Sequence, residues 1–237
     1  DEWRAKDCLK YTQKGDVIKP QYAIQRLYEA TRNLDDVFIT TEVGQHQMWA
    51  AQYSDFREPR LWLTSGSMGT MGFGLPAAIG AQFARPDKLV IDVDGDASIR
   101  MNLGEFETVT TYDLPIKIMV LNNFGDGMVM QWQRLFFKGR LSASDKSLRK
   151  KNFVKTAQAD GFEYAKRLDQ KEDVPPVLEE FLSFDGPAFL EVIIDTQAHV
   201  YPMVGPGLSY RDMITGEFIP NRYGPGKGHE PDPSEMF

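Results

Sequence analysis

The chain has 237 residues, of which 42% are hydrophobic and 26% are charged. This length allows one large domain or two small ones, and the composition favours a folded core over a disordered chain. The net charge of −7 arises from acidic and basic residues interspersed along the chain, which argues against a nucleic-acid backbone as partner. The only cysteine is Cys8, so an intrachain disulfide is excluded and a reducing, cytoplasmic location is expected.

The ends of the chain differ from its middle. Residues 1–17 are polar and contain several lysines, and the first residue is Asp1, so we expect a linker from a missing upstream region. No apolar run reaches transmembrane length and no signal peptide is recognisable, so no membrane partner is expected. Residues 205–237 are rich in glycine and proline and are expected to be a C-terminal tail or a lid.

The first elements of the expected domain alternate between helix and strand. Pro20 suits the first turn of a helix that ends near Asn33. Residues 37–41 are β-branched or aromatic and predict a buried strand. A shorter strand over residues 60–65 leads into a glycine-rich loop and then a helix of small residues, which we expect to pack closely on the sheet.

Two later strands end in polar side chains. Residues 89–93 form an apolar run that predicts a buried parallel strand, and Asp96 follows it in a tight turn. Residues 116–121 predict the next strand, which ends in Asn122 and Asn123. Asp96 and Asn123 are 27 residues apart, about the length of a strand-helix-strand crossover. Since ligands bind at the carboxyl edge of such sheets, we expect both side chains at one site.

The chemistry at this edge suits Mg²⁺ and a phosphate group. Mg²⁺ accepts a carboxylate oxygen and an amide oxygen as protein ligands. Phosphate oxygens and water supply its remaining ligands. Gly95 would let the backbone approach a phosphate, and a helix expected after Ser98 would offer N–H groups to an anion. The alternative is that these polar residues only make turns.

The stretch Gly95-Asp96-Ala97-Ser98, followed by Asn122-Asn123, resembles the thiamine diphosphate (ThDP) and metal-binding motif of ThDP-dependent enzymes. Ala97 stands where that motif usually has glycine, a departure similar to the acetohydroxyacid (acetolactate) synthases. The resemblance implies that Asp96, Asn123 and the carbonyl of Gly125 bind Mg²⁺, which holds the diphosphate.

Two further stretches belong to the same resemblance. Gly44, Gln45 and His46 follow the strand at residues 37–41, so they are expected to offer donors to the diphosphate. The alternative is that His46 is only a hydrogen-bonded polar residue at the start of a helix. Residues 66–74 contain four glycines, which indicates a close approach of a ligand or another backbone. The resemblance implies that Met71 supports the bent cofactor; the alternative is a core methionine.

The stretch from Gly127 to Gln133 resembles the substrate region of acetohydroxyacid synthases. The resemblance implies that Met128 lines the thiazolium ring and that Trp132 shapes the pocket of the acceptor; alternatively, Trp132 is a helix residue packed on the sheet. The residues before Gly127 depart from those usual in the family, which bears on substrate preference. The cofactor-binding residues predicted in this region are Asn123, Gly125, Asp126, Gly127, Met128 and Val129.

The remaining elements complete the alternation. Asn152 is expected to cap a helix that starts at Phe153 and stops at Gly161. An edge strand over residues 164–168, a helix over 174–184 and a last buried strand over 188–195 follow. The fold class predicted is therefore α/β, with a parallel central sheet and helices on both faces.

The resemblance covers residues 18–204 and corresponds to the diphosphate-binding domain of an acetohydroxyacid synthase catalytic subunit. It implies decarboxylation of pyruvate and condensation with a second 2-oxo acid, a step of branched-chain amino-acid biosynthesis. It also implies a homodimer or higher oligomer, a regulatory small subunit, and FAD in a middle domain that is absent here. A glutamate of a separate domain would activate the cofactor. Glu42 is not expected to be that residue, so the isolated chain is predicted to be inactive.

Three alternatives to this function stay open at the level of sequence. One is another ThDP-dependent carboligase, of the glyoxylate carboligase or sulfoacetaldehyde acetyltransferase type. Another is a non-catalytic module that binds ThDP and Mg²⁺. A third is a Mg²⁺-dependent nucleotide-binding domain, against which the sequence lacks a Gly-x-x-x-x-Gly-Lys-Ser/Thr loop.

Overall fold

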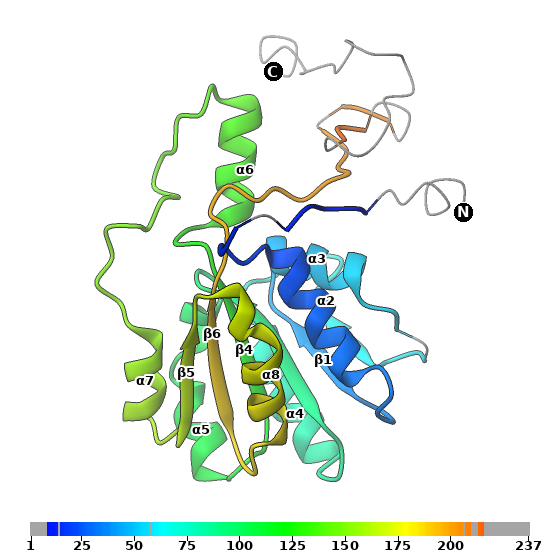
Figure 1. The fold of residues 1–237 in the computed structure, drawn as a ribbon, viewed down its shortest axis with the longest axis vertical. Helices are drawn as coiled ribbons and strands as arrows, with labels where there is room; N and C mark the ends of the chain where they lie inside the picture. The colour runs from blue at the N-terminus through cyan, green and yellow to red at the C-terminus, as the bar shows by residue number, and fades with distance from the viewer. Residues whose placement is uncertain (1–8, 14, 57, 206, 210–212, 216–237) are drawn as a thin grey trace.

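The computed structural model describes residues 9–13, 15–56, 58–205, 207–209 and 213–215. Its centre is a six-stranded sheet in the order β2-β1-β3-β4-β6-β5, and every neighbouring pair is parallel (Figure 1). The predicted α/β class with a parallel sheet is therefore confirmed. The strands are β1 (Phe38–Thr41), β2 (Trp62–Thr64), β3 (Val90–Gly95), β4 (Lys117–Asn122), β5 (Tyr164–Leu168) and β6 (Ala188–Ile193).

Helices cover both faces of the sheet because successive side chains of each strand point to opposite faces. Ile91 and Val93 of β3 belong to the core beneath one set of helices, whereas Val90 belongs to the core on the other face. The first core is covered by α2 (Pro20–Thr31), α3 (Gln45–Tyr53) and α8 (Val174–Ser183). The second is covered by α4 (Gly74–Ala84), α5 (Glu105–Thr111) and α7 (Phe153–Ala159).

The helix α6 (Gly127–Phe136) stands beyond the carboxyl ends of the strands and covers neither face of the sheet (Figure 1). The predicted edge strand is confirmed, since β5 is the last strand on one side of the sheet. Asn152 caps α7 as predicted: its side-chain oxygen accepts a hydrogen bond from the Lys155 N–H at 3.0 Å.

The helix expected after Ser98 is found, but it does not begin at once. The chain instead makes a short 3₁₀ turn, Ile99–Asn102, and α5 begins only at Glu105. Gly104, a poor helix former, separates the two elements, and the Asn102 side chain is used to bond the Gly72 carbonyl at 2.6 Å. A second 3₁₀ turn, Lys171–Asp173, precedes α8.

The described part of the N-terminal region packs on the domain. The Tyr11 ring lies edge-on to Tyr53, with 5.7 Å between ring centroids, and the Tyr11 hydroxyl donates to Gln25 at 2.6 Å. Residues 1–8 and 216–237 lie outside the described residues, so most of the predicted tail or lid does too. Within the part that the structure describes, no helix has both the length and the apolarity to span a membrane.

Candidate active site

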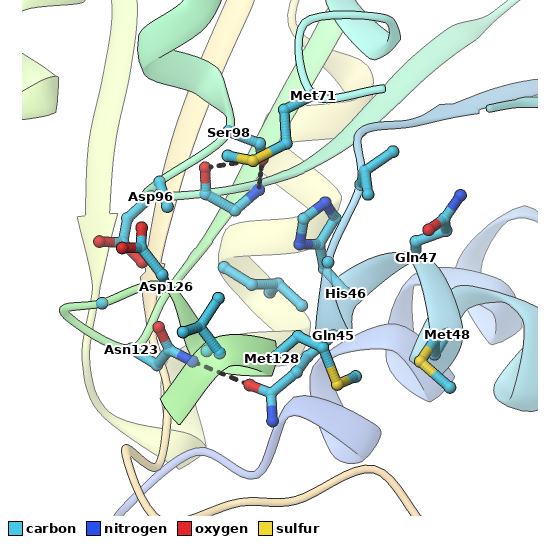
Figure 2. Close-up of a pocket in the computed structure, with 18 of the residues that line it drawn as sticks. Gln45, His46, Gln47, Met48, Met71, Asp96, Ser98, Asn123, Asp126 and Met128 are labelled. Atoms are coloured by element: carbon cyan, nitrogen blue, oxygen red, sulfur yellow. Dashed lines mark hydrogen bonds between the residues drawn. The ribbon is translucent and has the colours of Figure 1, made fainter. Parts of the chain in front are cut away.

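A cavity of about 280 Å³ lies at the carboxyl ends of β1, β3 and β4 (Figure 2). It takes its walls from the segments that follow these three strands, from the glycine-rich loop before α4 and from the start of α6. The structure brings all of the predicted cofactor-binding residues to this one cavity: Gly44, Gln45, His46, Met71, Gly95, Asp96, Ala97, Ser98, Asn123, Gly125, Asp126, Gly127, Met128 and Val129.

The pairing of β3 with β4 brings the predicted metal ligands together. Gly95 is in register with Leu121, and the Asp96 N–H donates to the Leu121 carbonyl at 3.3 Å. Burial raises the pKa of the Asp96 carboxyl to about 7, while hydrogen bonds with the backbones of Asn123 and Gly125 oppose that rise. The carboxyl group therefore lies against the loop that carries the other two predicted ligands.

The residues present fit a divalent cation that also binds phosphate. No described lysine or arginine forms a salt bridge with the Asp96 side chain, so a cation would offset the cost of ionising this buried group. Within the described residues, no group of three or more His, Cys, Asp or Glu side chains could hold a metal ion. One carboxylate, one amide oxygen and one carbonyl suit Mg²⁺, which completes its octahedron with phosphate oxygens and water.

The loop between the two predicted loop ligands is held in an unusual conformation. Phe124, which lies between Asn123 and Gly125, has a φ of 59°, in the left-handed region that non-glycine residues rarely adopt. Its N–H donates to the Asn122 side-chain oxygen at 2.8 Å, and its carbonyl accepts from the Lys146 N–H at 2.8 Å. These two bonds fix the peptide groups on both sides of Phe124 and so hold the loop in shape.

A segment before α7 also packs on this loop, which the sequence did not indicate. The Asp126 N–H donates to the Ser144 carbonyl at 2.9 Å, and the Asp126 carboxylate pairs with Lys146 at 3.1 Å. Gly125 has no room for a side chain, since a Cβ there would lie 2.7 Å from the Ser144 carbonyl oxygen. The composition of this segment gave no signal for such a contact.

His46 lies at the centre of the cavity wall (Figure 2). Burial lowers the pKa of its imidazole to about 3, so the ring is neutral at pH 7. Its Nε2 atom is buried and has no hydrogen-bond partner in the described structure. Gly95 makes room for this ring, because a Cβ there would lie 2.7 Å from Nδ1. The absence of a side chain at Gly95 therefore makes room for His46, and the predicted approach of its backbone to a phosphate stays a prediction.

The glycine-rich loop is clamped by a buried glutamate. The Glu42 carboxylate accepts hydrogen bonds from the N–H groups of Gly72 at 2.7 Å and Gly74 at 2.8 Å, at the start of α4. An anion at a helix start is favourable, because the first N–H groups there have no partner within the helix. The clamp holds Met71, which lines the cavity one residue earlier (Figure 2).

Two more carboxyl groups are buried beside Glu42. Asp92 accepts from the Thr40 hydroxyl at 2.7 Å, and Asp94 accepts from the Gly95 N–H at 2.6 Å and from the Ser98 hydroxyl. Burial raises the pKa of Asp92 to about 8 and that of Asp94 well above its usual value, with the neighbouring carboxyl charges adding to both. The sequence did contain a signal for this cluster, since Asp92 and Asp94 are two residues apart in one strand and such side chains point to the same face of the sheet.

The family is decided by comparison with known sequences. The model described as "Thiamine pyrophosphate enzyme, C-terminal TPP binding domain" matches residues 42–192, where thiamine pyrophosphate is another name for ThDP. The chain belongs to this thiamine pyrophosphate enzyme family. The match spans the segments after β1, β3 and β4 that line the cavity.

The chain is also similar to three proteins named as acetolactate synthases. It is 46% identical to acetolactate synthase 1, chloroplastic, of Nicotiana tabacum over 90% of the chain and 32% of the relative. It is 45% identical to the mitochondrial acetolactate synthase of Schizosaccharomyces pombe over 92% of the chain and 32% of the relative. The Saccharomyces cerevisiae mitochondrial catalytic subunit is 43% identical over 90% of the chain and 31% of the relative. The predicted resemblance is confirmed, and the chain spans about a third of the length of these relatives.

One predicted site residue of this thiamine pyrophosphate enzyme domain lies away from the cavity. Trp132 is half-buried on α6, and its ring lies edge-on to Phe136, with 5.1 Å between ring centroids. It is not among the residues that line the cavity, unlike Met71 and Met128. Its contact with an acceptor stays a prediction.

Proposed function

We propose that the chain is the ThDP-binding part of an acetolactate synthase, which condenses pyruvate with a second 2-oxo acid after decarboxylation. The observation that supports this most directly is the single cavity into which the predicted cofactor-binding residues converge. The cavity lies within a thiamine pyrophosphate enzyme domain, and the relatives are named as acetolactate synthases. ThDP, when bound, would supply the carbon that attacks the 2-oxo acid.

The residues of the chain would hold and orient that group. Asp96, Asn123 and the carbonyl of Gly125 would bind Mg²⁺, and the unpartnered Nε2 of His46 would face the diphosphate. Met71, fixed by the Glu42 clamp, would support the bent cofactor. Trp132 would shape the acceptor pocket once α6 meets the rest of the protein.

The partners and surroundings are proposals of the same kind. We infer that the working enzyme is a homodimer or higher oligomer with a regulatory small subunit, and that FAD binds in a middle domain outside this chain. We also infer that it works in branched-chain amino-acid biosynthesis. A cytoplasmic location stays a prediction; the relatives named above are chloroplastic or mitochondrial.

A second candidate is another ThDP-dependent carboligase. It is favoured by one observation: the Asp126 carboxylate lies at the cavity wall, where the sequence departs from the pattern usual in acetohydroxyacid synthases. Its charge is balanced by Lys146, so it adds little net charge to the cavity. Analysis of the products that the complete enzyme makes from pyruvate alone distinguishes the two candidates.

The test of the proposed function is binding of ThDP in the presence of Mg²⁺, measured by calorimetry. Asp96→Ala removes the carboxylate that would bridge cation and protein, so we expect ThDP affinity to fall by at least about tenfold. Asp87→Ala is the matched control, because Asp87 is exposed and precedes the amino end of the same strand. Equal ThDP affinity in Asp96→Ala and Asp87→Ala would contradict the metal assignment.

A further inference from the structure

Three buried carboxamides from three elements form a chain that ends at the predicted metal site. Gln131 lies on α6 and has no exposed surface, Gln45 begins α3, and Asn123 follows β4. Gln45 donates to the Gln131 side-chain oxygen at 2.8 Å, and Asn123 donates to the Gln45 side-chain oxygen at 3.0 Å. Figure 2 shows the last of these links at the cavity wall.

The direction of this chain is fixed at its far end by backbone atoms. The Val200 N–H can only donate, and it donates to the Gln131 Oε1 at 2.8 Å. The Gln131 Nε2 then faces the Val200 carbonyl at 2.9 Å and the Met203 sulfur at 3.0 Å, which both accept. A flipped Gln131 side chain would place oxygen against oxygen and N–H against N–H, so only one orientation satisfies every group.

The orientation of the second carboxamide, Gln45, is fixed in the same way. The Gln45 Nε2 donates both to the Gln131 Oε1 and to the Ala198 carbonyl at 3.2 Å. Since a carbonyl only accepts, the Gln45 oxygen must point the other way, toward Asn123. That oxygen accepts from the Asn123 Nδ2, which leaves the Asn123 Oδ1 as the free end of the chain.

We propose that Gln131 is a positioning residue for the metal site: through Gln45 it fixes the orientation of Asn123 so that Oδ1, and not the NH₂ group, is presented to the cation. This inference rests on the proposed function. It follows because a neutral amide binds Mg²⁺ through its oxygen, while its NH₂ group would direct hydrogens at the cation. A rotated Asn123 would also set its oxygen against the oxygen of the buried Gln45 side chain.

The residue that fixes the orientation of Asn123 lies outside the cavity. Gln131 is not among the cavity-lining residues, and its backbone partners belong to the segment that follows β6. Gln45 lines the cavity, but both ends of its side chain are bonded to protein. Its predicted contact with the diphosphate is therefore replaced, in this proposal, by a role in holding Asn123.

The first experiment needs neither cofactor nor cation. Exchange of the Asn123 side-chain amide protons with solvent is followed by NMR in the metal-free chain. In the wild type the Nδ2 group is bonded, so we expect slow exchange. Gln131→Leu leaves the Gln45 side chain held only by its bond to the Ala198 carbonyl, so we expect the Asn123 amide protons to exchange up to about tenfold faster, the factor that corresponds to the loss of one hydrogen bond.

The matched control is Gln82→Leu. Gln82 is a buried glutamine of α4 whose side chain also donates to backbone carbonyls, those of Arg85 and Lys88 among them, but it lies at the opposite end of the sheet. Both leucine variants are expected to lower the melting temperature. Only Gln131→Leu is expected to change the Asn123 exchange. Equal exchange in Gln131→Leu and wild type would overturn the proposal.

The second experiment measures Mn²⁺ affinity in the presence of ThDP by electron paramagnetic resonance. We expect a loss of about 10–100-fold in Gln131→Leu and none in Gln82→Leu. Gln131→Glu should recover most of the affinity, because a protonated carboxyl group at this buried position offers an oxygen to Gln45 and to the Val200 N–H, and its hydroxyl can donate to the Val200 carbonyl. Loss of affinity in Gln131→Glu equal to that in Gln131→Leu would count against the orientation mechanism.

The two experiments separate this proposal from the proposed function. If Gln131→Leu does not fold, Gln45→Met removes the next link and carries the same expectations. If the wild type binds no Mn²⁺ with ThDP, the proposed function and the metal end of this proposal fail together. If the wild type binds Mn²⁺ but its affinity is unchanged in Gln131→Leu, the positioning role alone is overturned.

Discussion

Single buried carboxyl groups make the stability of this domain depend on pH. Asp92 has no exposed surface, and burial raises its pKa to about 8, against about 3.9 in an unfolded chain. Between these values the folded chain keeps a proton that the unfolded chain has lost. Stability from this group is therefore greatest below pH 4, falls as the pH rises, and levels off above pH 8.

The prediction at Asp92 is tested with Asp92→Asn. The variant keeps an oxygen for the Thr40 hydroxyl, but its amide does not titrate. The free energy of unfolding of the variant should therefore rise relative to that of the wild type between pH 6.5 and pH 8. The limiting gain for one proton is about 1.4 kcal/mol per pH unit. Urea unfolding at several pH values measures it. His46 does not disturb this window, because its lowered pKa affects stability only below about pH 6.5.

The control is Asp87→Asn, whose side chain is largely exposed. Its unfolding free energy should follow that of the wild type at every pH. If Asp92→Asn also follows the wild type from pH 6.5 to 8, the Asp92 carboxyl is ionised in the folded protein and the predicted burial effect is wrong.

Some of the residues that the sequence placed at the site have positions that depend only on the ends of strands. Asp96 and Asn123 follow two adjacent strands, so any parallel pairing of those strands brings them together. The role of Gln131 depends on contacts between α6 and the segment after β6, which no local pattern encodes. The sequence contained no sign of the Glu42 clamp, because its bond with Gly72 requires the tertiary path of the glycine-rich loop.

At the scale of elements, the start of α6 is packed against the carboxamide chain. A Cβ at Gly127 would lie 2.2 Å from the Gln45 Oε1 and 2.3 Å from the Asn123 Nδ2. Gly127 does not have a positive φ, so the restriction is steric and not conformational. The helix can begin here only because its first residue has no side chain.

We predict that Gly127→Ala separates Asn123 from Gln45. Overpacking of this kind costs typically about 1–3 kcal/mol, so the melting temperature should fall and Mn²⁺ affinity with ThDP should fall with it. Gly80→Ala is the matched control, since Gly80 is an exposed residue of α4 with open space around its Cβ position. Alanine there should stabilise the chain by up to about 1 kcal/mol. Similar changes of melting temperature and Mn²⁺ affinity in the two variants would contradict the steric explanation.

Most elements were predictable because each has a clear local pattern. The apolar runs of β3, β4 and β6 identify buried parallel strands, and these were found within one or two residues of the predicted bounds. The 3₁₀ turn after Ser98 was not predictable, since it depends on the bond from Asn102 to the distant Gly72 carbonyl. The pairing of Gly125 with Asp145 likewise joins segments far apart in sequence.

For the whole molecule, the order of the strands explains where the cavity lies. β2 is on one side of β1 and β3 is on the other, so the chain changes direction across the sheet between these strands. Segments that leave β1 and β3 diverge at such a switch point and open a crevice at the carboxyl edge. His46 and Asp96 stand in the cavity walls formed by these two segments (Figure 2).

This geometry supplies the cavity with donors and metal ligands but with few acids. The side-chain carboxyl groups that line the cavity are Asp96 and Asp126, and both lie on the side of the predicted metal loop (Figure 2). Glu42 is bonded to Gly72 and Gly74, so its carboxylate is already used. The resemblance implies that the glutamate that activates ThDP belongs to another domain.

We therefore predict that these 237 residues alone make no detectable acetolactate, even when ThDP and Mg²⁺ are bound. Loss of a positioned acid-base group costs about 10²–10⁴ in rate, and loss of the opposite wall of the cleft forfeits orientation worth roughly 7–11 kcal/mol. The measurement is an acetolactate assay on the purified chain with ThDP, Mg²⁺, FAD and pyruvate, after calorimetry has established that the cofactor is bound. Turnover of about 1 s⁻¹ or more, as in typical enzymes, would mean that a complete active site lies within this chain.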